Sequence, residues 1–78
     1  MLIYSIRYIH WNNTHYVASN VNGYLIIIES IGAEFRIGHQ ISYDGEMIFN
    51  LTLNEGTDAV IKLKGNEKKV YEYIRSIK

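Results

Sequence analysis

Cysteine and proline are both absent from this chain of 78 residues. Without cysteine the protein can form neither a disulfide nor a thiolate metal site, so a reducing compartment suits it and we predict a cytoplasmic protein. The stability of the folded chain must then come from a small core, with no covalent staple.

Long apolar runs and a net charge are missing as well. The N-terminal residues 1–11 include Arg7 and contain no apolar run long enough for a signal peptide or a membrane span, so we expect no membrane association. Eight basic residues balance eight acidic ones. A net charge of zero argues against a dedicated nucleic-acid binder, because neutralising phosphates supplies most of the non-specific affinity for nucleic acids.

The charges are nevertheless unevenly distributed. From residue 58 onward basic residues are in excess, namely Lys62, Lys64, Lys68, Lys69, Arg75 and Lys78 against Asp58, Glu67 and Glu72. The preceding residues carry an equal excess of acids. We interpret this pattern as a solvated strand followed by a surface helix.

Length and residue pattern together predict one small domain, residues 1–78. A chain of this size buries only about 60–65% of the surface that it exposes when unfolded. Apolar and polar residues alternate through most of the chain, which is typical of half-buried strands. We predict a mainly β fold with one C-terminal α-helix, a small antiparallel barrel or roll of about six strands. The strand order stays open between SH3-like, OB-like and pleckstrin-like, because tertiary contacts decide which non-adjacent strands pair.

The central part of the chain, residues 34–53, predicts a hairpin whose turn is at Asp44–Gly45. A two-residue loop there would set the apolar side of one strand against the polar side of the other. We therefore expect a three-residue loop with Gly45 in the left-handed region. This register pairs Ile41 with Met47, His39 with Phe49 and Ile37 with Leu51. Gly38, inside the first of these strands, marks a bulge or a bend.

The N-terminal part predicts a three-stranded meander, in which Asn12–Asn13 and Asn22–Gly23 form two-residue turns. These turns pair Tyr8 with Val17, His10 with His15, Val17 with Ile28, and Ser19 with Ile26. One face of the meander then carries Tyr4, Ile6, Tyr8, Val17, Val21, Tyr24, Ile26 and Ile28, and we assign it to the core.

The opposite, outer face of the meander is also apolar. It presents Ile9, Trp11, Tyr16, Ala18, Leu25 and Ile27. An exposed apolar patch of this kind usually marks a contact with a partner. The alternative is that the C-terminal helix, predicted over residues 66–77 with Asn66 as its N-cap, lies over this face. The helix has one apolar stripe, formed by Val70, Tyr73, Ile74 and Ile77.

The three histidines are the obvious candidates for chemistry, but no pairing completes a site around them. His10 and His15 lie opposite each other in the predicted hairpin, and two ligands do not make a metal site. Glu29 falls on the other face in the same registers, so we predict no metal centre. His39 has no nucleophile or carboxylate beside it and suits a barrel mouth. We expect neither an enzyme nor a cofactor.

These observations lead to three hypotheses on function. The first is a non-enzymatic interaction module that associates with itself, as a homodimer, or with a protein partner through the outer face of the meander. The second is a weak single-stranded nucleic-acid binder, with contacts from Arg7, Trp11, Tyr16, Lys62, Lys64, Lys68 and Lys69. The third is a small-ligand pocket, or a vestigial enzyme, at the barrel mouth near His39.

Overall fold

The computed structural model describes residues 2–77 and confirms the predicted class. Seven antiparallel strands form one curled sheet, and one helix is present in the described residues. The elements are β1 (Leu2–Ile9), β2 (His15–Ser19), β3 (Leu25–Glu29), β4 (Gln40–Tyr43), β5 (Ile48–Asn50), β6 (Glu55–Gly56), β7 (Val60–Gly65) and α1 (Glu67–Ser76).

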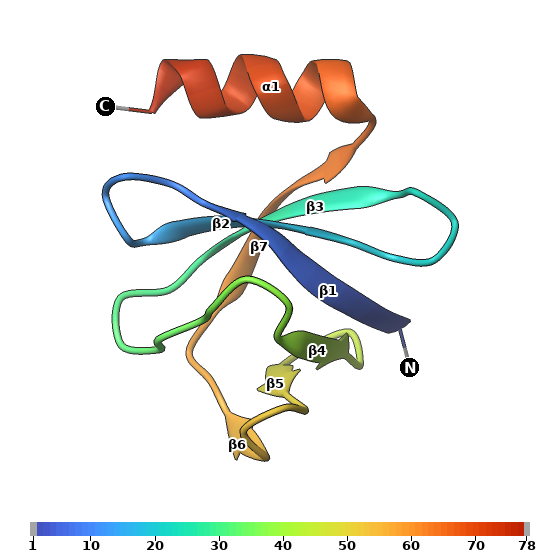
Figure 1. The fold of residues 1–78 in the computed structure, drawn as a ribbon, viewed down its shortest axis with the longest axis vertical. Coiled ribbons are helices and arrows are strands. Elements are labelled where there is room, and N and C mark those ends of the chain that lie inside the picture. The colour runs from blue at the N-terminus through green and yellow to red at the C-terminus, as the bar shows by residue number, and fades with distance from the viewer. Residues whose placement is uncertain (1, 78) are drawn as a thin grey trace.

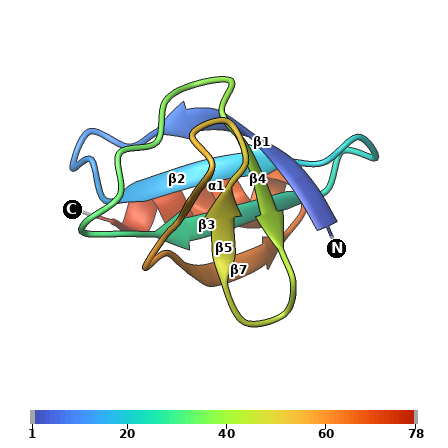
Figure 2. The same ribbon diagram turned by 90° about the horizontal axis from the view of Figure 1, so that it is seen from below.

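The strand order is β6-β5-β4-β1-β2-β3-β7, with β1 at the centre. Residues 2–5 of β1 pair with β4, whereas residues 5–9 pair with β2. The sheet therefore divides into two layers, and Figure 2 shows β4 and β5 crossing over β2, β3 and β7. The chain from β6 to β7 links the two outer strands of the sheet, so the fold is a half-closed barrel.

The main core lies on the concave side of this sheet. We call it the inner core; its buried residues are Tyr4, Ile6, Tyr16, Ala18, Ile26, Ile28, Phe35, Ile41, Ile48 and Ala59. Isoleucine dominates this set because a β-branched side chain packs well on a pleated surface.

The convex side of β3 is covered by α1 (Figure 1). Val17, Ile27 and Val70 form a second, helix-side core, with Leu25, Leu63, Tyr73 and Ile74 packed against it. The predicted cap is confirmed, since the Asn66 side chain accepts a hydrogen bond from Lys69 N at 3.0 Å. A helix this short is unstable in isolation, so its docking on the sheet holds it in place.

The predicted register between β2 and β3 is wrong by one residue. Val17 pairs with Ile27 and Ser19 pairs with Leu25. The loop is longer than predicted because the Asn20 side chain accepts hydrogen bonds from the backbone of Asn22 and Tyr24, at 2.9 Å each. A slip of one residue exchanges the faces of a strand, so Val17 leaves the face of Ile26 and Ile28 and joins Ile27.

A β-bulge in β1 also exchanges the faces of the residues that follow it. Ile6 pairs with Ala18 and Tyr8 with Val17, which leaves Arg7 as the extra residue. The predicted pairing of Tyr8 with Val17 is confirmed, and His10 N donates to His15 O at 2.9 Å. Tyr8 nevertheless lies on the convex side, whereas Ile6 lies in the inner core, because the bulge breaks the alternation.

The central hairpin has a longer turn than predicted, residues 44–47. Asp44 Oδ1 accepts hydrogen bonds from the backbone N–H groups of Glu46 and Met47, which closes the turn. The corrected register pairs Tyr43 with Ile48, Ser42 with Phe49 and Ile41 with Asn50. Gly45 does adopt a positive φ of 105°.

The first strand of this hairpin is also shorter than predicted. β4 begins only at Gln40, because the chain turns at Gly38, whose φ of +90° confirms a bend. Ile37 and Met47 are therefore exposed. Asn50, by contrast, is buried, and its side-chain amide bonds to His39 Nδ1.

The helix α1 is neither long nor apolar enough to cross a membrane, and it is the one helix in residues 2–77.

The two-sided burial of β3 leads to a stability prediction. Ile27→Ala opens a cavity between the sheet and α1, and we expect it to reduce the free energy of unfolding by about 2–5 kcal/mol. Urea unfolding measures this change. The control is Val21→Ala, because Val21 is 99% exposed in the β2–β3 turn and its truncation is expected to change stability by about 0.5 kcal/mol or less. Equal losses from the two variants would contradict a buried Ile27.

Candidate partner-binding groove

An apolar groove runs along one side of α1. The helix packs against β3 and β7, and the groove lies between it and residues of β1 and β2. The groove has a volume of about 620 Å³ and is lined by Tyr8, Val17, Leu25, Glu67, Lys68, Val70, Tyr71 and Ile74. We call it the helix groove. Its floor is aliphatic and its walls are formed by β1 on one side and α1 on the other.

Aromatic side chains form the rim of the helix groove. Tyr8 stands exposed on the β1 side, and Tyr71 is 64% exposed on the helix side. The Arg75 guanidinium lies 5.7 Å from the centre of the Tyr71 ring. Beyond Tyr8, the ring of His10 lies 6.2 Å from Tyr8 and 5.5 Å from Trp11. A row of aromatic rings therefore leads from the groove to the β1–β2 turn, where Trp11 is 70% exposed.

The six residues predicted for the outer face do not form one surface. Ile9, Tyr16 and Ala18 belong to the inner core or pack against it. Leu25 and Ile27 lie beneath α1, and Trp11 is exposed in the turn. The one-residue slip and the bulge in β1 separate them. Of the six, Leu25 and Ile27 are the residues against which α1 packs.

The sequence analysis did not predict that Tyr8 and Val17 line one groove together with residues of α1. The signal that could have revealed it is Asn20, whose side chain can close a longer turn than Asn22–Gly23 alone. With that turn, Val17 shares a face with Leu25 and Ile27. The residue that completes the rim, Tyr71, is exposed on the helix surface, outside the stripe that docks.

The residues of the nucleic-acid hypothesis are also dispersed. Burial removes Tyr16 from the surface and raises the pKa of its hydroxyl, which bonds to Asn13 O at 2.9 Å. Lys62 is paired with Glu29 at 3.5 Å, and the Lys64 ammonium lies 5.4 Å from the centre of the Tyr43 ring. The remaining residues of this set are Arg7, Trp11, Lys68 and Lys69, of which Lys68 lines the helix groove.

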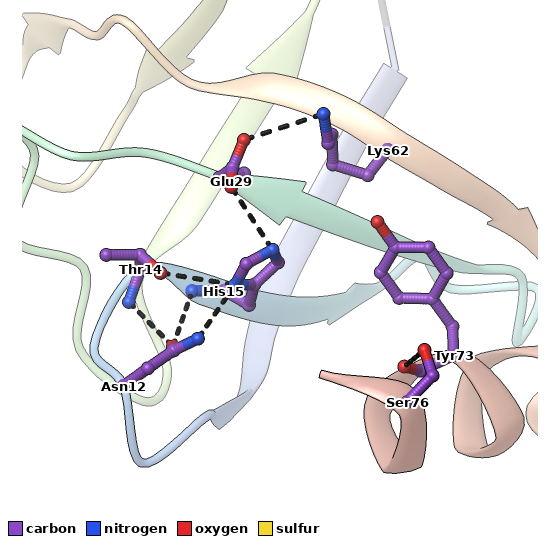
Figure 3. Close-up of polar contacts among 7 residues, drawn as sticks. All are labelled: Asn12, Thr14, His15, Glu29, Lys62, Tyr73 and Ser76. Atoms are coloured by element: carbon purple, nitrogen blue, oxygen red, sulfur yellow. Dashed lines mark hydrogen bonds and ion pairs between the residues drawn. The ribbon is translucent and has the colours of Figure 1, made fainter. Parts of the chain in front are cut away.

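His15 is the centre of a hydrogen-bonded network (Figure 3). The Asn12 amide nitrogen lies 3.0 Å from His15 Nδ1, and because this nitrogen only donates, Nδ1 is the acceptor and Nε2 carries the proton. His15 Nε2 faces the Glu29 carboxylate at 3.3 Å. The prediction that Glu29 lies on the other face is therefore wrong. The corrected register between β2 and β3 pairs His15 with Glu29 and brings both side chains to one face. The network ties the β1–β2 turn to β3.

His10 is almost fully buried beside His15. The two rings are perpendicular, with their centres 6.4 Å apart, and His10 Nδ1 lies 3.4 Å from the Tyr8 hydroxyl. The other nitrogen, Nε2, has no hydrogen-bond partner within residues 2–77. Those residues contain no cluster of three or more side chains with the arrangement of a metal site.

A second concavity, of about 840 Å³, lies at the barrel mouth and includes His39. His39 Nδ1 accepts hydrogen bonds from Arg36 N and from the Asn50 amide, each at 3.2 Å. Asp58 accepts a hydrogen bond from the Ser30 hydroxyl, which lowers the pKa of the Asp58 carboxyl. The hydrogen bonds of these polar groups therefore fix the loop 30–39 to the neighbouring segments of the chain.

Of the two concavities, the helix groove is the better candidate for binding. Its floor offers apolar surface that can be buried further, whereas exposed charges of both signs surround the mouth and its central polar groups bond to one another. No protein-family model matches this chain, and comparisons with curated proteins and with solved structures give no match. The assignment of the groove therefore depends on its geometry.

The contact between Ser30 and Asp58 leads to a pH prediction. The depressed pKa of Asp58 stabilises the fold at neutral pH, and this contribution is lost as the pH falls through the folded-state pKa. Ser30→Ala should raise the Asp58 pKa toward its ordinary value of about 3.9 and shrink the loss of stability below about pH 4. An NMR titration of the side-chain carboxyl carbons measures the pKa. Asp44 is the internal control, since the backbone N–H groups of Met47 and Glu46 lower its pKa independently. An unchanged Asp58 pKa would contradict the assigned cause.

Proposed function

We propose that this protein is a non-enzymatic interaction module that binds a protein partner, or a second copy of itself, in the helix groove. The observation that carries the proposal is the incomplete cover of the convex sheet face. The helix α1 buries Ile27 and part of Leu25, but the surface between Tyr8 and Tyr71 stays open. The interaction surface that we propose is therefore the part of the meander at the edge of α1, and not the whole outer face predicted from the sequence.

The dimensions and the residue types of the groove suit a protein segment. Its volume falls in the range of about 300–1,000 Å³ that is typical of ligand pockets, which is room for a few side chains. Tyrosine and tryptophan supply much of the binding energy in protein interfaces. Here Tyr8 and Tyr71 line the groove, and Trp11 is exposed in the β1–β2 turn beyond Tyr8. Burying these rings removes apolar surface from water while their polar atoms stay at the rim.

Single-stranded nucleic acid is the second candidate, supported by Arg7, Trp11 and Lys68 near the groove. An aliphatic floor favours a protein segment over bases, because bases bind by stacking on aromatic faces. The zero net charge of the chain also favours a protein segment over a nucleic acid. We also propose that the protein acts in the cytoplasm, since a chain without cysteine is suited to a reducing compartment.

A selection from a library of random dodecapeptides displayed on phage tests the groove. The native protein should enrich peptides that Tyr71→Ala binds about tenfold more weakly, because truncating an aromatic hot spot costs about 1–2 kcal/mol or more. Tyr24→Ala is the matched control: Tyr24 is 65% exposed, nearly the same as Tyr71, and does not line the groove. Peptides that bind both variants equally would contradict the groove as the binding site.

Analytical ultracentrifugation of the protein at micromolar concentrations tests whether a second copy occupies the groove, because it measures the weight-average mass. If a second copy occupies the groove, the weight-average mass rises with concentration in the native protein and in Tyr24→Ala, but not in Tyr71→Ala. A constant monomer mass, together with enriched peptides, assigns the groove to a separate partner.

A further inference from the structure

Three cations stand around the helix groove. Lys68 lines it directly, and Arg75 lies over the Tyr71 ring at its rim. Arg7, the extra residue of the β1 bulge, reaches Ser19, which is the strand partner of Leu25 in the groove floor. Of the residues that line the groove, Glu67 is the one acid. The groove thus combines an aliphatic floor with a rim at which Arg7, Lys68 and Arg75 outnumber the acid Glu67.

None of these cations has an ionic partner within residues 2–77. The ion pairs of that part of the chain are those of Glu29 with His15 and with Lys62. Two of the cations are nevertheless held in place. Arg7 donates from Nε to Ser19 Oγ at 2.8 Å, which leaves its terminal nitrogens as donors, and Arg75 is held against Tyr71. Side chains that are already oriented lose less entropy when they bind a carboxylate.

The position of Lys68 in α1 is unfavourable with respect to the helix dipole. It lies in the first turn of α1, where the positive end of the helix dipole disfavours a cation. The favourable acid of that turn is Glu67. Lys68 therefore stands at a position that is unfavourable for the helix and open to the groove.

Five of the eight acids lie at the other end of the molecule, whereas Glu67 lines the groove and Glu72 lies on α1. Asp44 and Glu46 lie at the β4–β5 turn, and Glu34, Glu55 and Asp58 surround the barrel mouth. Figure 1 shows α1 at one end of the molecule and the β4–β6 region at the other. The protein is neutral as a whole, and around the groove the cations Arg7, Lys68 and Arg75 outnumber the acids Glu67 and Glu72.

We propose that the occupant of the helix groove is an acidic protein segment, and this inference rests on the groove being the partner site proposed above. One or two apolar side chains of the segment lie on the floor formed by Val17, Leu25 and Ile74. Carboxylates on either side of them bind Arg7, Lys68 and Arg75, because arginine and carboxylate form strong, charge-assisted hydrogen bonds.

A second copy of the chain fits this surface less well. A two-fold dimer brings the same patch of both copies together, so the cations of one rim would face those of the other. Like charges in contact oppose association. Nucleic acid shares the negative charge but not the apolar anchor, and Arg75 already occupies the neighbourhood of the Tyr71 ring on which a base would stack.

Two synthetic peptides and an oligothymidylate test the inference by NMR titration of the ¹⁵N-labelled protein. The first peptide has a Leu-Phe centre flanked on each side by two Glu; in the second, every Glu is Gln. We expect the Glu peptide to shift the amide signals of the groove and to bind about tenfold more tightly at low salt, an advantage that salt reduces. The oligothymidylate should leave these signals unchanged.

Substitutions identify the cations responsible. The triple variant Arg7→Gln, Lys68→Gln and Arg75→Gln should bind the Glu peptide about tenfold more weakly and the Gln peptide as before. Lys68→Gln alone, at an exposed helix position, provides a milder test in case the triple variant is unstable. Lys69→Gln is the matched control, because Lys69 has the same charge on the same turn but does not line the groove. It should bind like the native protein.

Three results would overturn the inference. Equal affinity for the Glu and Gln peptides in the groove would remove the role of charge and leave the proposed function intact. Tighter binding of the oligothymidylate would assign the rim to nucleic acid. No shift of the groove signals by the Glu peptide would refute an acidic occupant, and the separate selection with Tyr71→Ala and Tyr24→Ala decides whether the groove binds any peptide.

Discussion

The strand β3 imposes the main constraint on this fold, because it is buried on both of its faces. Ile26 and Ile28 face the inner core, and Ile27 faces α1. Three consecutive isoleucines cannot form a strand with one wet side, so the chain needs a layer above and a layer below. The curled sheet supplies the first layer and the C-terminal helix supplies the second. A domain of this length has little other apolar surface to bury, which makes these two contacts central to its stability.

The helix is shorter than the surface that it has to cover. Its ten residues span β3 and β7 and leave the convex side of β1 and β2 partly open. The helix groove is the direct result of this mismatch. It exposes Tyr8 beside the buried Val17. Binding of a protein segment there would complete the second layer, and the oriented cations at the rim give that segment its expected charge.

Local polar contacts decided the strand registers, and through them the residues of the groove. Asn20 lengthens the β2–β3 turn by accepting two backbone hydrogen bonds, and Asp44 does the same in the central hairpin. The bulge at Arg7 then moves Tyr8 to the convex face. The Asn20 turn and the bulge each shift a strand by one residue, and the Asp44 turn shifts the central hairpin by three. A shift by an odd number of residues exchanges the two faces of a strand. The predicted set of outer residues was consequently divided: Ile9, Tyr16 and Ala18 lie in or against the inner core, Leu25 and Ile27 lie beneath α1, and Trp11 is exposed in the β1–β2 turn.

The sequence by itself determined the mainly β class, the strands around Tyr8, Val17 and Ile27, and the helix that begins after Asn66. Alternation and helical spacing reflect the geometry of the backbone, and they hold wherever the strand lies in the sheet. Only the tertiary structure decided the registers, the order of the strands and the face that each side chain occupies. These depend on competition between turns that differ by one residue and on contacts between distant segments, such as Ser30 with Asp58. The helix groove belongs to this second group, because its walls come from β1 and α1, the two opposite ends of the chain.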